Sequence, residues 1–230
     1  MNNHISQWNN SYKNKDNFVF YPHEEIIRFI SKYIKKRIGF NDFKKQYNFH
    51  HLPKVLDFGC GIGRHVKLIN EFKLDAYGFD LSTDAISYAK EIFQQQNLSY
   101  LGNKVIQANI TNLPYDDNKF DFMLSHGVLD SMPFEIAKIG MSELHRCIQN
   151  DGYIYFDLIS TKDSSFNGNL EKEIDEAHEL GTIQSYFDLH KINLLLGKLF
   201  QIQEITLIEK QDILNNINHA RYHVVVKKLR

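Results

Sequence analysis

The chain has 230 residues, with 27 Lys and Arg against 28 Asp and Glu and a formal net charge of −1. This length suffices for one α/β domain with a sizeable core, and the balanced charge gives no global attraction to nucleic acid or to an anionic membrane. Two cysteines, Cys60 and Cys147, are typical of a reducing compartment, so we predict no disulfide. Because the start lacks the order of a secretory signal and no apolar run is long enough to span a bilayer, we expect a cytoplasmic protein without a membrane partner.

Residues 1–50 form a polar segment, a predicted helix and a connector. Trp8 and Tyr12 are four positions apart and share a face if their segment is helical, and with Tyr21 they are candidate substrate-binding residues. After Pro22 an apolar stripe predicts a core-facing helix, formed by Ile26, Ile27, Ile30, Tyr33, Ile34 and Ile38. The opposite face and the pattern-free connector over 41–52 carry basic residues that fit a solvated surface or an RNA-binding patch: Lys32, Lys35, Lys36, Arg37, Lys44 and Lys45.

The chain is organised around residues 54–65. The apolar run from Val55 to Phe58 is typical of a strand buried in a parallel sheet, three glycines on alternate positions end it, and a helical pattern follows. Residues 76–80 predict a second strand, which ends in a carboxylate 23 positions after Asp57. An acid at about this distance is placed to accept hydrogen bonds from the ribose hydroxyls of an adenosine.

A strand, a glycine loop and a helix N-terminus together describe a nucleotide-type cofactor site, for either a nicotinamide dinucleotide or S-adenosylmethionine. Asp57 stands two residues before the first glycine, where the dinucleotide pattern usually has an apolar residue. The spacing Gly59-x-Gly61-x-Gly63 also lacks the two residues that precede the last glycine of that pattern. An acid near the loop suits the ammonium group of a methionine moiety, so these residues favour S-adenosylmethionine.

Further along, three more parallel strands are predicted over 104–108, 120–125 and 153–159, with amphipathic helices between them. Residues 161–184 are a polar insertion with a charged helical stretch near its end, and they fit an acceptor-binding element or a surface loop equally well. A helix that closes on Gly197 and two strands complete the chain, over 200–210 and 219–228.

Four segments carry a resemblance to one family: residues 55–63, 78–82, 120–125 and 144–152. Taken together, residues 52–160 resemble the class I S-adenosylmethionine-dependent methyltransferases. The resemblance implies a single α/β domain over 1–230, with a Rossmann-like, doubly wound, mostly parallel seven-stranded sheet, an antiparallel C-terminal strand and helices on both faces. It also implies that the N-terminal segment can act as a lid over cofactor and acceptor, although its aromatic residues fit a segment that only packs on the surface equally well.

The resemblance assigns S-adenosylmethionine as the cofactor and S-adenosylhomocysteine as the product. We expect no metal, because the eleven histidines are scattered and no Cys/His spacing matches a zinc site. Asn109 stands where the family commonly has an acid that bonds the adenine amino group, and its side-chain oxygen can accept there instead. His126 follows the fourth strand, near the expected sulfonium, and is the candidate general base. The candidate cofactor-binding residues are Asp57, Phe58, Gly59, Cys60, Gly61, Asp80, Leu81, Asn109, Ile110 and Ser125.

We therefore expect methyl transfer to a small polar acceptor, at an oxygen of a sugar or another metabolite, by a monomer or homodimer. The Asn/Asp-Pro-Pro-aromatic sequence of amino-methylating nucleic-acid enzymes is absent after the fourth strand, where residues 125–128 read Ser-His-Gly-Val. Nucleic acid is accordingly not the expected partner. Two alternatives stay open, an RNA-modifying methyltransferase and a non-catalytic subunit that binds S-adenosylmethionine.

Overall fold

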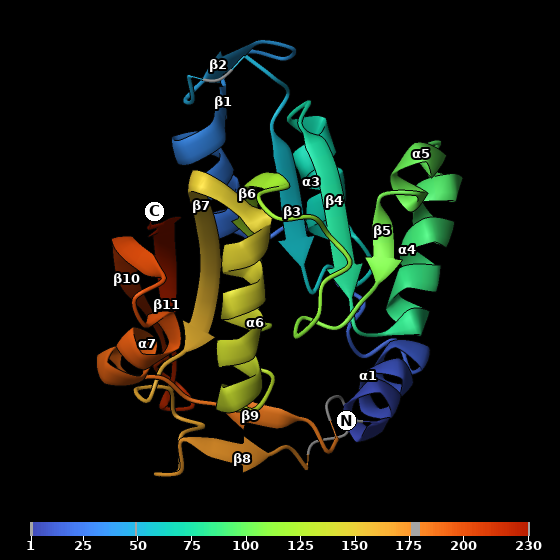
Figure 1. The fold of residues 1–230 in the computed structure, drawn as a ribbon. Coiled ribbons are helices and arrows are strands. Elements are labelled where there is room, and N and C mark those ends of the chain that lie inside the picture. Colours follow the sequence, from blue (N-terminus) through green and yellow to red (C-terminus); the bar gives the residue numbers. More distant parts are fainter. Residues whose placement is uncertain (1, 49, 176–179, 230) are drawn as a thin grey trace.

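The computed structural model describes residues 2–48, 50–175 and 180–229. Its centre is a seven-stranded sheet with the strand order β10-β11-β7-β6-β3-β4-β5 (Figure 1). The strands of this sheet are β3 (Lys54–Phe58), β4 (Asp75–Asp80), β5 (Val105–Gln107), β6 (Phe120–Leu124), β7 (Ile148–Ile159), β10 (Phe200–Asp212) and β11 (Ile217–Lys228).

Strand directions confirm the predicted fold class. β3 pairs in parallel with β4 and β6, β4 with β5, and β6 with β7. β11 runs antiparallel to β7, and β10 runs antiparallel to β11, so β11 alone opposes the other six strands of this sheet. Because parallel neighbours need crossover connections, helices cover both faces of such a sheet.

The two faces are visible in the alternation of side chains along the central strands. Leu56, Phe58 and Met123 belong to one buried cluster, whereas Val55 and Leu124 belong to another. The first cluster packs against α6 (Phe134–Cys147) and α7 (Leu189–Leu196). The second packs against α2 (Glu24–Phe29), α3 (Arg64–Glu71), α4 (Thr83–Gln95) and the short α5 (Ser99–Gly102).

The N-terminal segment departs from its predicted structure. α1 (Asn2–Lys13) is helical, but the predicted helix over 26–38 is wrong beyond Ile34. There, α2 continues into a π-helical turn, η1 (Ile30–Ile34), and the chain then forms β1 (Lys35–Arg37). This strand pairs with β2 (Phe43–Lys45), inside the connector that lacked a pattern, and leaves Ile38 63% exposed.

The insertion over 161–184 also differs from its prediction. A small antiparallel sheet forms from β8 (Glu171–Glu173) and β9 (Ile183–Ser185), so the helical expectation is wrong at β8. The remainder of that expectation, over 176–179, lies outside the described residues. Within the described part of the chain, no helix combines the length and the apolar character that a membrane span requires.

Candidate active site

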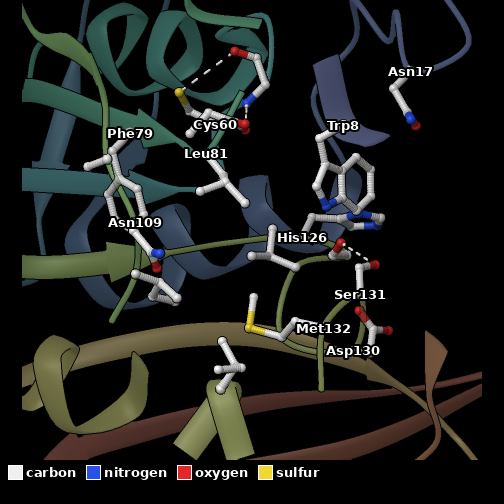
Figure 2. A pocket seen from close by; sticks show the side chains of 18 of the residues that line it. Trp8, Asn17, Cys60, Phe79, Leu81, Asn109, His126, Asp130, Ser131 and Met132 are labelled. Carbon is white, nitrogen blue, oxygen red and sulfur yellow. Dashed lines mark hydrogen bonds between the residues drawn. The ribbon is translucent and has the colours of Figure 1, made fainter. Parts of the chain in front are cut away.

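A cavity of about 560 Å³ opens where β3, β4, β5 and β6 end, at the carboxyl edge of the parallel strands. This edge is where open α/β sheets bind ligands, and the volume is in the usual range for small-molecule sites. Figure 2 shows Phe79 and Asn109 on one side of the cavity and His126, Ser131 and Asp130 on the other.

The glycine loop after β3 forms one wall. Gly59 and Gly61 have φ angles of +70° and +52°, which favour glycine, and both line the cavity with Cys60. A Cβ built on Gly61 would lie 2.6 Å from the hydroxyl oxygen of Tyr12, and one on Gly59 would lie 2.3 Å from Val128. Only glycine therefore fits at these two positions, because a Cβ would collide with Tyr12 or Val128.

Asp80, at the end of β4, fixes the loop from the next strand. Its Oδ2 accepts a hydrogen bond of 2.8 Å from the Gly61 N–H, and its Oδ1 accepts one of 2.9 Å from the Ser82 N–H. Burial raises the pKa of this carboxyl to about 6, although both amides oppose the shift. An ionised carboxylate has about four acceptor positions, so two remain for the hydroxyls of a ribose. Ser82 also caps α4, as its hydroxyl accepts from the Ala85 N–H.

Asp57 lies behind the loop, fully buried, and neither of its carboxylate oxygens has a hydrogen-bond partner among the described residues. The nearest cationic candidate is His65, whose Nδ1 lies 3.7 Å from Oδ1. A buried carboxylate without a partner is costly unless a ligand supplies a donor or a positive charge. The ammonium group of a methionine moiety has both properties, so this part of the site fits S-adenosylmethionine.

The segments after β4 and β5 continue this wall and fit the adenine. Leu81 and Ile110 line the cavity with apolar surface, and Asn109 lines it beside Ile110. Asn109 Oδ1 accepts hydrogen bonds of 3.0 Å from both the N–H and the hydroxyl of Thr111. Because these two bonds use its lone pairs, the side-chain amide N–H₂ is the group left to meet a ring nitrogen, rather than the oxygen expected from the sequence.

The structure does not bring all the predicted residues into the cavity. Asp57, Phe58 and Ser125 are buried and do not line it; the Ser125 hydroxyl donates to the Phe58 carbonyl at 2.7 Å and joins β6 to β3. Trp8 and Tyr12, on one face of α1, do line the cavity. Tyr21 does not, because its side chain is 84% exposed and only its carbonyl is engaged, by Arg64.

His126 lines the cavity with its imidazole Nε2 3.6 Å from Asp157 Oδ2. The ring of His23 lies against it, with ring centroids 3.9 Å apart. Burial lowers the pKa of His126 to about 3 and that of His23 to about 4, although Asp157 opposes both shifts. Both imidazoles are therefore neutral near pH 7. The unprotonated Nδ1 of His23 accepts from the Glu25 N–H and caps α2, which leaves His126 as the imidazole that offers an unprotonated nitrogen to the cavity.

A buried ion network next to His126 was missed by the sequence analysis. Arg221, on β11, donates to Asp157 Oδ2 at 2.7 Å and to Asp130 Oδ2 at 2.6 Å. Burial raises the pKa of Asp130 despite Arg221, whereas Arg221 and His126 hold the pKa of Asp157 low although burial raises it. Asp130 is 1% exposed and lines the cavity, yet its Oδ1 has no hydrogen-bond partner among the described residues. In the sequence, the one available signal of this network was Asp130, an isolated acid in the stretch after β6.

The insertion contributes to this wall through β9. Gln184 lines the cavity, and its side-chain amide donates to the Asp130 carbonyl at 2.9 Å, while the Ser185 N–H donates to the same oxygen at 2.7 Å. The polar segment over 161–184 thus reaches the side of the cavity opposite to the glycine loop, as an acceptor-side element would.

Comparison with known proteins gives one family for most of the chain. A family model described as a methyltransferase domain matches residues 50–219. Similar curated proteins include an uncharacterized protein of Haemophilus influenzae, 28% identical over 129 residues that cover 56% of this chain and 49% of that protein. The sterol 4-C-methyltransferase strm-1 of Caenorhabditis elegans is 26% identical over 141 residues, which cover 61% of this chain and 39% of that protein. The chain thus spans about half, or less, of the length of these curated relatives.

Solved structures share the fold. A SAM-dependent methyltransferase of Methanosarcina mazei superposes with a TM-score of 0.64 at 18% identity, over 79% of this chain and 94% of that one. TehB of Haemophilus influenzae superposes with a TM-score of 0.63 at 16% identity, over 96% of this chain and 67% of that one. The family match, the strand order and the glycine loop with its two aspartates agree, and the chain belongs to the methyltransferase domain family as a class I S-adenosylmethionine-dependent domain.

Proposed function

We propose that the protein transfers the methyl group of S-adenosylmethionine to a small polar acceptor, at an oxygen of a sugar or another metabolite. The observation that carries this proposal is that one cavity has both a cofactor wall and a polar wall. The glycine loop, Asp80 and the segment around Asn109 form the cofactor wall. The polar wall, on the other side, contains His126, Asp130 and Arg221. Trp8 of α1 lies over the same cavity.

The cofactor wall divides the cofactor into three parts. Asp57 and the backbone of Gly59 and Gly61 would lie at the methionine part, Asp80, which holds the Gly61 N–H, would bind the ribose, and the segment around Asn109 the adenine. The bound cofactor supplies a methyl group on a sulfonium, which is already activated for in-line displacement. What the chain adds is the position of the acceptor, and such positioning contributes roughly 7–11 kcal/mol in favourable cases.

Charges on the polar wall restrict which chemical groups of the acceptor can enter this part of the cavity. Arg221 is shared by Asp130 and Asp157, and the free Oδ1 of Asp130 needs a hydrogen-bond donor. An acceptor with a hydroxyl or an amine supplies that donor, whereas a carboxylate or phosphate would place a second anion against a buried one. We infer that the acceptor is neutral or cationic at the group that enters this corner.

His126 is placed to accept a hydrogen bond from the hydroxyl that is methylated. A general base works best when its pKa lies near the operating pH, and the pKa of His126 is about 3. Its role is therefore mainly to orient the hydroxyl, with Asp157 close enough to stabilise the imidazolium that proton transfer would form.

The RNA alternative loses support from the position of the basic residues. The lysines and the arginine on β1 and β2 lie at the end of the sheet opposite to the cavity (Figure 1). β3 alone separates the two ends by five residues, about 16 Å of extended chain. An RNA held there would have to extend over this distance to bring a base to His126.

Two measurements on the purified full-length protein test the proposal. Calorimetry is expected to detect binding of S-adenosylmethionine and S-adenosylhomocysteine, and Asp80→Ala is expected to lose at least tenfold in affinity for both. Release of S-adenosylhomocysteine is then followed across sugars, phenols, amines and tRNA. No binding of either compound would refute the family function, whereas binding without turnover on any acceptor would favour the non-catalytic subunit, and turnover on tRNA alone would favour the RNA alternative.

A further inference from the structure

The β1–β2 hairpin combines like charges in a way that weakens its own pairing. We call residues 35–45 the basic hairpin; its five cations and one acid, Asp42, give it a net charge of +4 in a chain of net charge −1. In its register Lys35 lies opposite Lys45, and Lys36 lies opposite Lys44. Like charges directly opposite each other on neighbouring strands are destabilising, and a two-stranded sheet is marginal by itself.

Carboxylates of the described residues do not neutralise these charges. Among the described residues, none of the five cations forms an ion pair with a carboxylate; Lys35 donates to the Lys73 carbonyl, and Arg37 donates to backbone carbonyls of the turn. Cations instead surround one ring, with Lys35 Nζ 4.9 Å and Lys73 Nζ 5.6 Å from the centroid of Phe43. Burial and the charges of Lys45 and Lys73 lower the pKa of Lys35. The basic hairpin thus holds several positive charges close together, at a cost in the stability of its own pairing.

The turn of the basic hairpin presents apolar side chains beyond these charges. Ile38 is 63% exposed and Phe40 is 83% exposed. The backbone behind them is held, because the Ile38 N–H donates to the Asp42 carbonyl and Arg37 donates to the carbonyls of Gly39 and Phe40. A fixed apolar tip with a ring of cations behind it is the arrangement of an element that enters a lipid interface, where the apolar side chains leave water and the cations meet headgroups.

The position of the hairpin separates it from catalysis. Figure 1 shows β1 and β2 projecting from the end of the sheet opposite to α1, and α1 supplies Trp8 and Tyr12 to the cavity. A partner bound at the basic hairpin therefore leaves the cavity open to a small acceptor. An RNA partner would be served by several exposed aromatic rings among the cations, whereas in the basic hairpin Phe40 is the one exposed ring and the half-buried Phe43 ring is covered by cations.

We propose that the basic hairpin docks the protein on an anionic lipid surface, with Ile38 and Phe40 in the interface and the lysines on the phosphate headgroups. The balanced net charge of the whole chain conceals this site, because the excess of positive charge is confined to eleven residues. The inference does not depend on which acceptor is methylated.

Co-sedimentation of the full-length protein with lipid vesicles tests the proposal. We expect binding to vesicles that contain about one third phosphatidylglycerol, little binding to pure phosphatidylcholine, and a decline as salt screens the charges. The double variant Lys36→Gln, Lys44→Gln removes one cross-strand repulsion, so we expect it to fold. We expect it to bind the anionic vesicles roughly 30-fold more weakly than the unmodified protein. Phe40→Ser is expected to bind more weakly while the slope of the salt dependence is retained.

The matched control changes the same charge elsewhere, through the exposed Lys90→Gln and Lys198→Gln, and is expected to bind vesicles like the unmodified protein. Equal binding to both kinds of vesicle, no binding to either at low salt, or equal weakening by the control pair would each overturn the proposal. So would tight binding of tRNA by a protein that ignores vesicles. Affinity for S-adenosylmethionine, measured on the same variants, is expected to stay constant, which separates this proposal from the methyl transfer.

Discussion

Asp80 serves two requirements that oppose each other. Its carboxylate must be charged to hold the Gly61 and Ser82 amides and to accept from a ribose, but it lies 8% exposed in an apolar surrounding. Burial therefore raises its pKa from 3.8 to about 6. Such a shift disfavours the charged form and is common where function, rather than stability, selects a buried acid.

As the pH is lowered, the raised pKa of Asp80 is therefore expected to decrease the affinity for S-adenosylmethionine and to increase the stability of the ligand-free protein. Below about pH 6 Asp80 becomes protonated, so affinity for S-adenosylmethionine is expected to fall by up to tenfold per pH unit between pH 6 and pH 5. In the ligand-free protein the raised pKa contributes stability that is present below about pH 4 and is lost as the pH rises through 6. Calorimetric titration and urea unfolding at pH 5, 6 and 7 check the two trends. The assignment fails if affinity is constant over this range in the protein with Asp80 and in Asp80→Asn alike.

Some residue roles could be read from the sequence because their signals are local. Asp57, the glycines and Asp80 occur within 24 positions and follow strand-end patterns. The corner formed by Asp130, Asp157 and Arg221 could not be read, since Arg221 is 91 and 64 residues away from its two partners. No periodicity relates such positions; only the pairing of β11 with β7 brings them together.

At the scale of elements, α1 and the glycine loop form one unit although α1 ends at Lys13 and the loop begins only at Gly59. Tyr12 is 8% exposed and stands against Gly61, and Asn9 Oδ1 accepts from the Ser82 hydroxyl at 2.7 Å. Burial raises the pKa of the Tyr12 hydroxyl, and Asp80 adds to this shift, so the phenol stays protonated beside the loop. The N-terminal helix thus lies on the cofactor wall as part of the site.

The helix α5 was not predicted and β7 begins five residues before its predicted start, but the other strands between residues 54 and 160 were predicted close to their observed bounds, because apolar runs mark them. The segment over 26–48 was not, since the stripe through Ile34 continues to Ile38 in sequence while the chain has already left the helix. There, tertiary pairing with β2 overrides helical periodicity.

Replacement of Gly61 by alanine tests the contact between α1 and the loop. The φ of +52° costs an alanine roughly 1–2 kcal/mol, and the new Cβ would lie 2.6 Å from the Tyr12 hydroxyl oxygen, so Tyr12 must move. Gly61→Ala is expected to lower both thermal stability and affinity for S-adenosylmethionine. Tyr12→Phe combined with Gly61→Ala is expected to recover part of the loss, because the next ring atom is 3.5 Å away.

Gly168→Ala is the matched control for this cycle. Its φ is +97°, but a Cβ there meets nothing within 4 Å, so it carries backbone strain alone. We expect it to lose stability and to keep its affinity for S-adenosylmethionine. Equal losses in Gly61→Ala and in the double variant, by calorimetry and thermal unfolding, would mean that Tyr12 does not pack on the loop.

For the whole molecule, the order of the strands places the cofactor wall and the acceptor wall on different halves of the sheet. The ends of β3, β4 and β5 supply the cofactor wall, whereas the ends of β6 and β7 and the antiparallel β11 supply the acceptor wall. The two walls meet between β3 and β6, where the crossover connections change direction, which is the usual ligand position in such sheets. Arg221 joins the acceptor half, because it binds carboxylates from β7 and from the stretch after β6.

Removal of this arginine is expected to destabilise the whole fold in a pH-dependent way. Arg221→Met leaves Asp130 and Asp157 buried without a cation, at a cost of about 3–5 kcal/mol at pH 7. Without Arg221 the pKa of both carboxyls rises, so protonation relieves the variant and its deficit is expected to shrink as the pH falls from 7 to 5. Adding Asp130→Asn should recover part of the loss, whereas Lys162→Met, which breaks an exposed pair with Glu209, should cost less than about 1 kcal/mol. Urea unfolding at both pH values measures this, and a deficit that grows on acidification would contradict the role of Arg221 as the shared counterion.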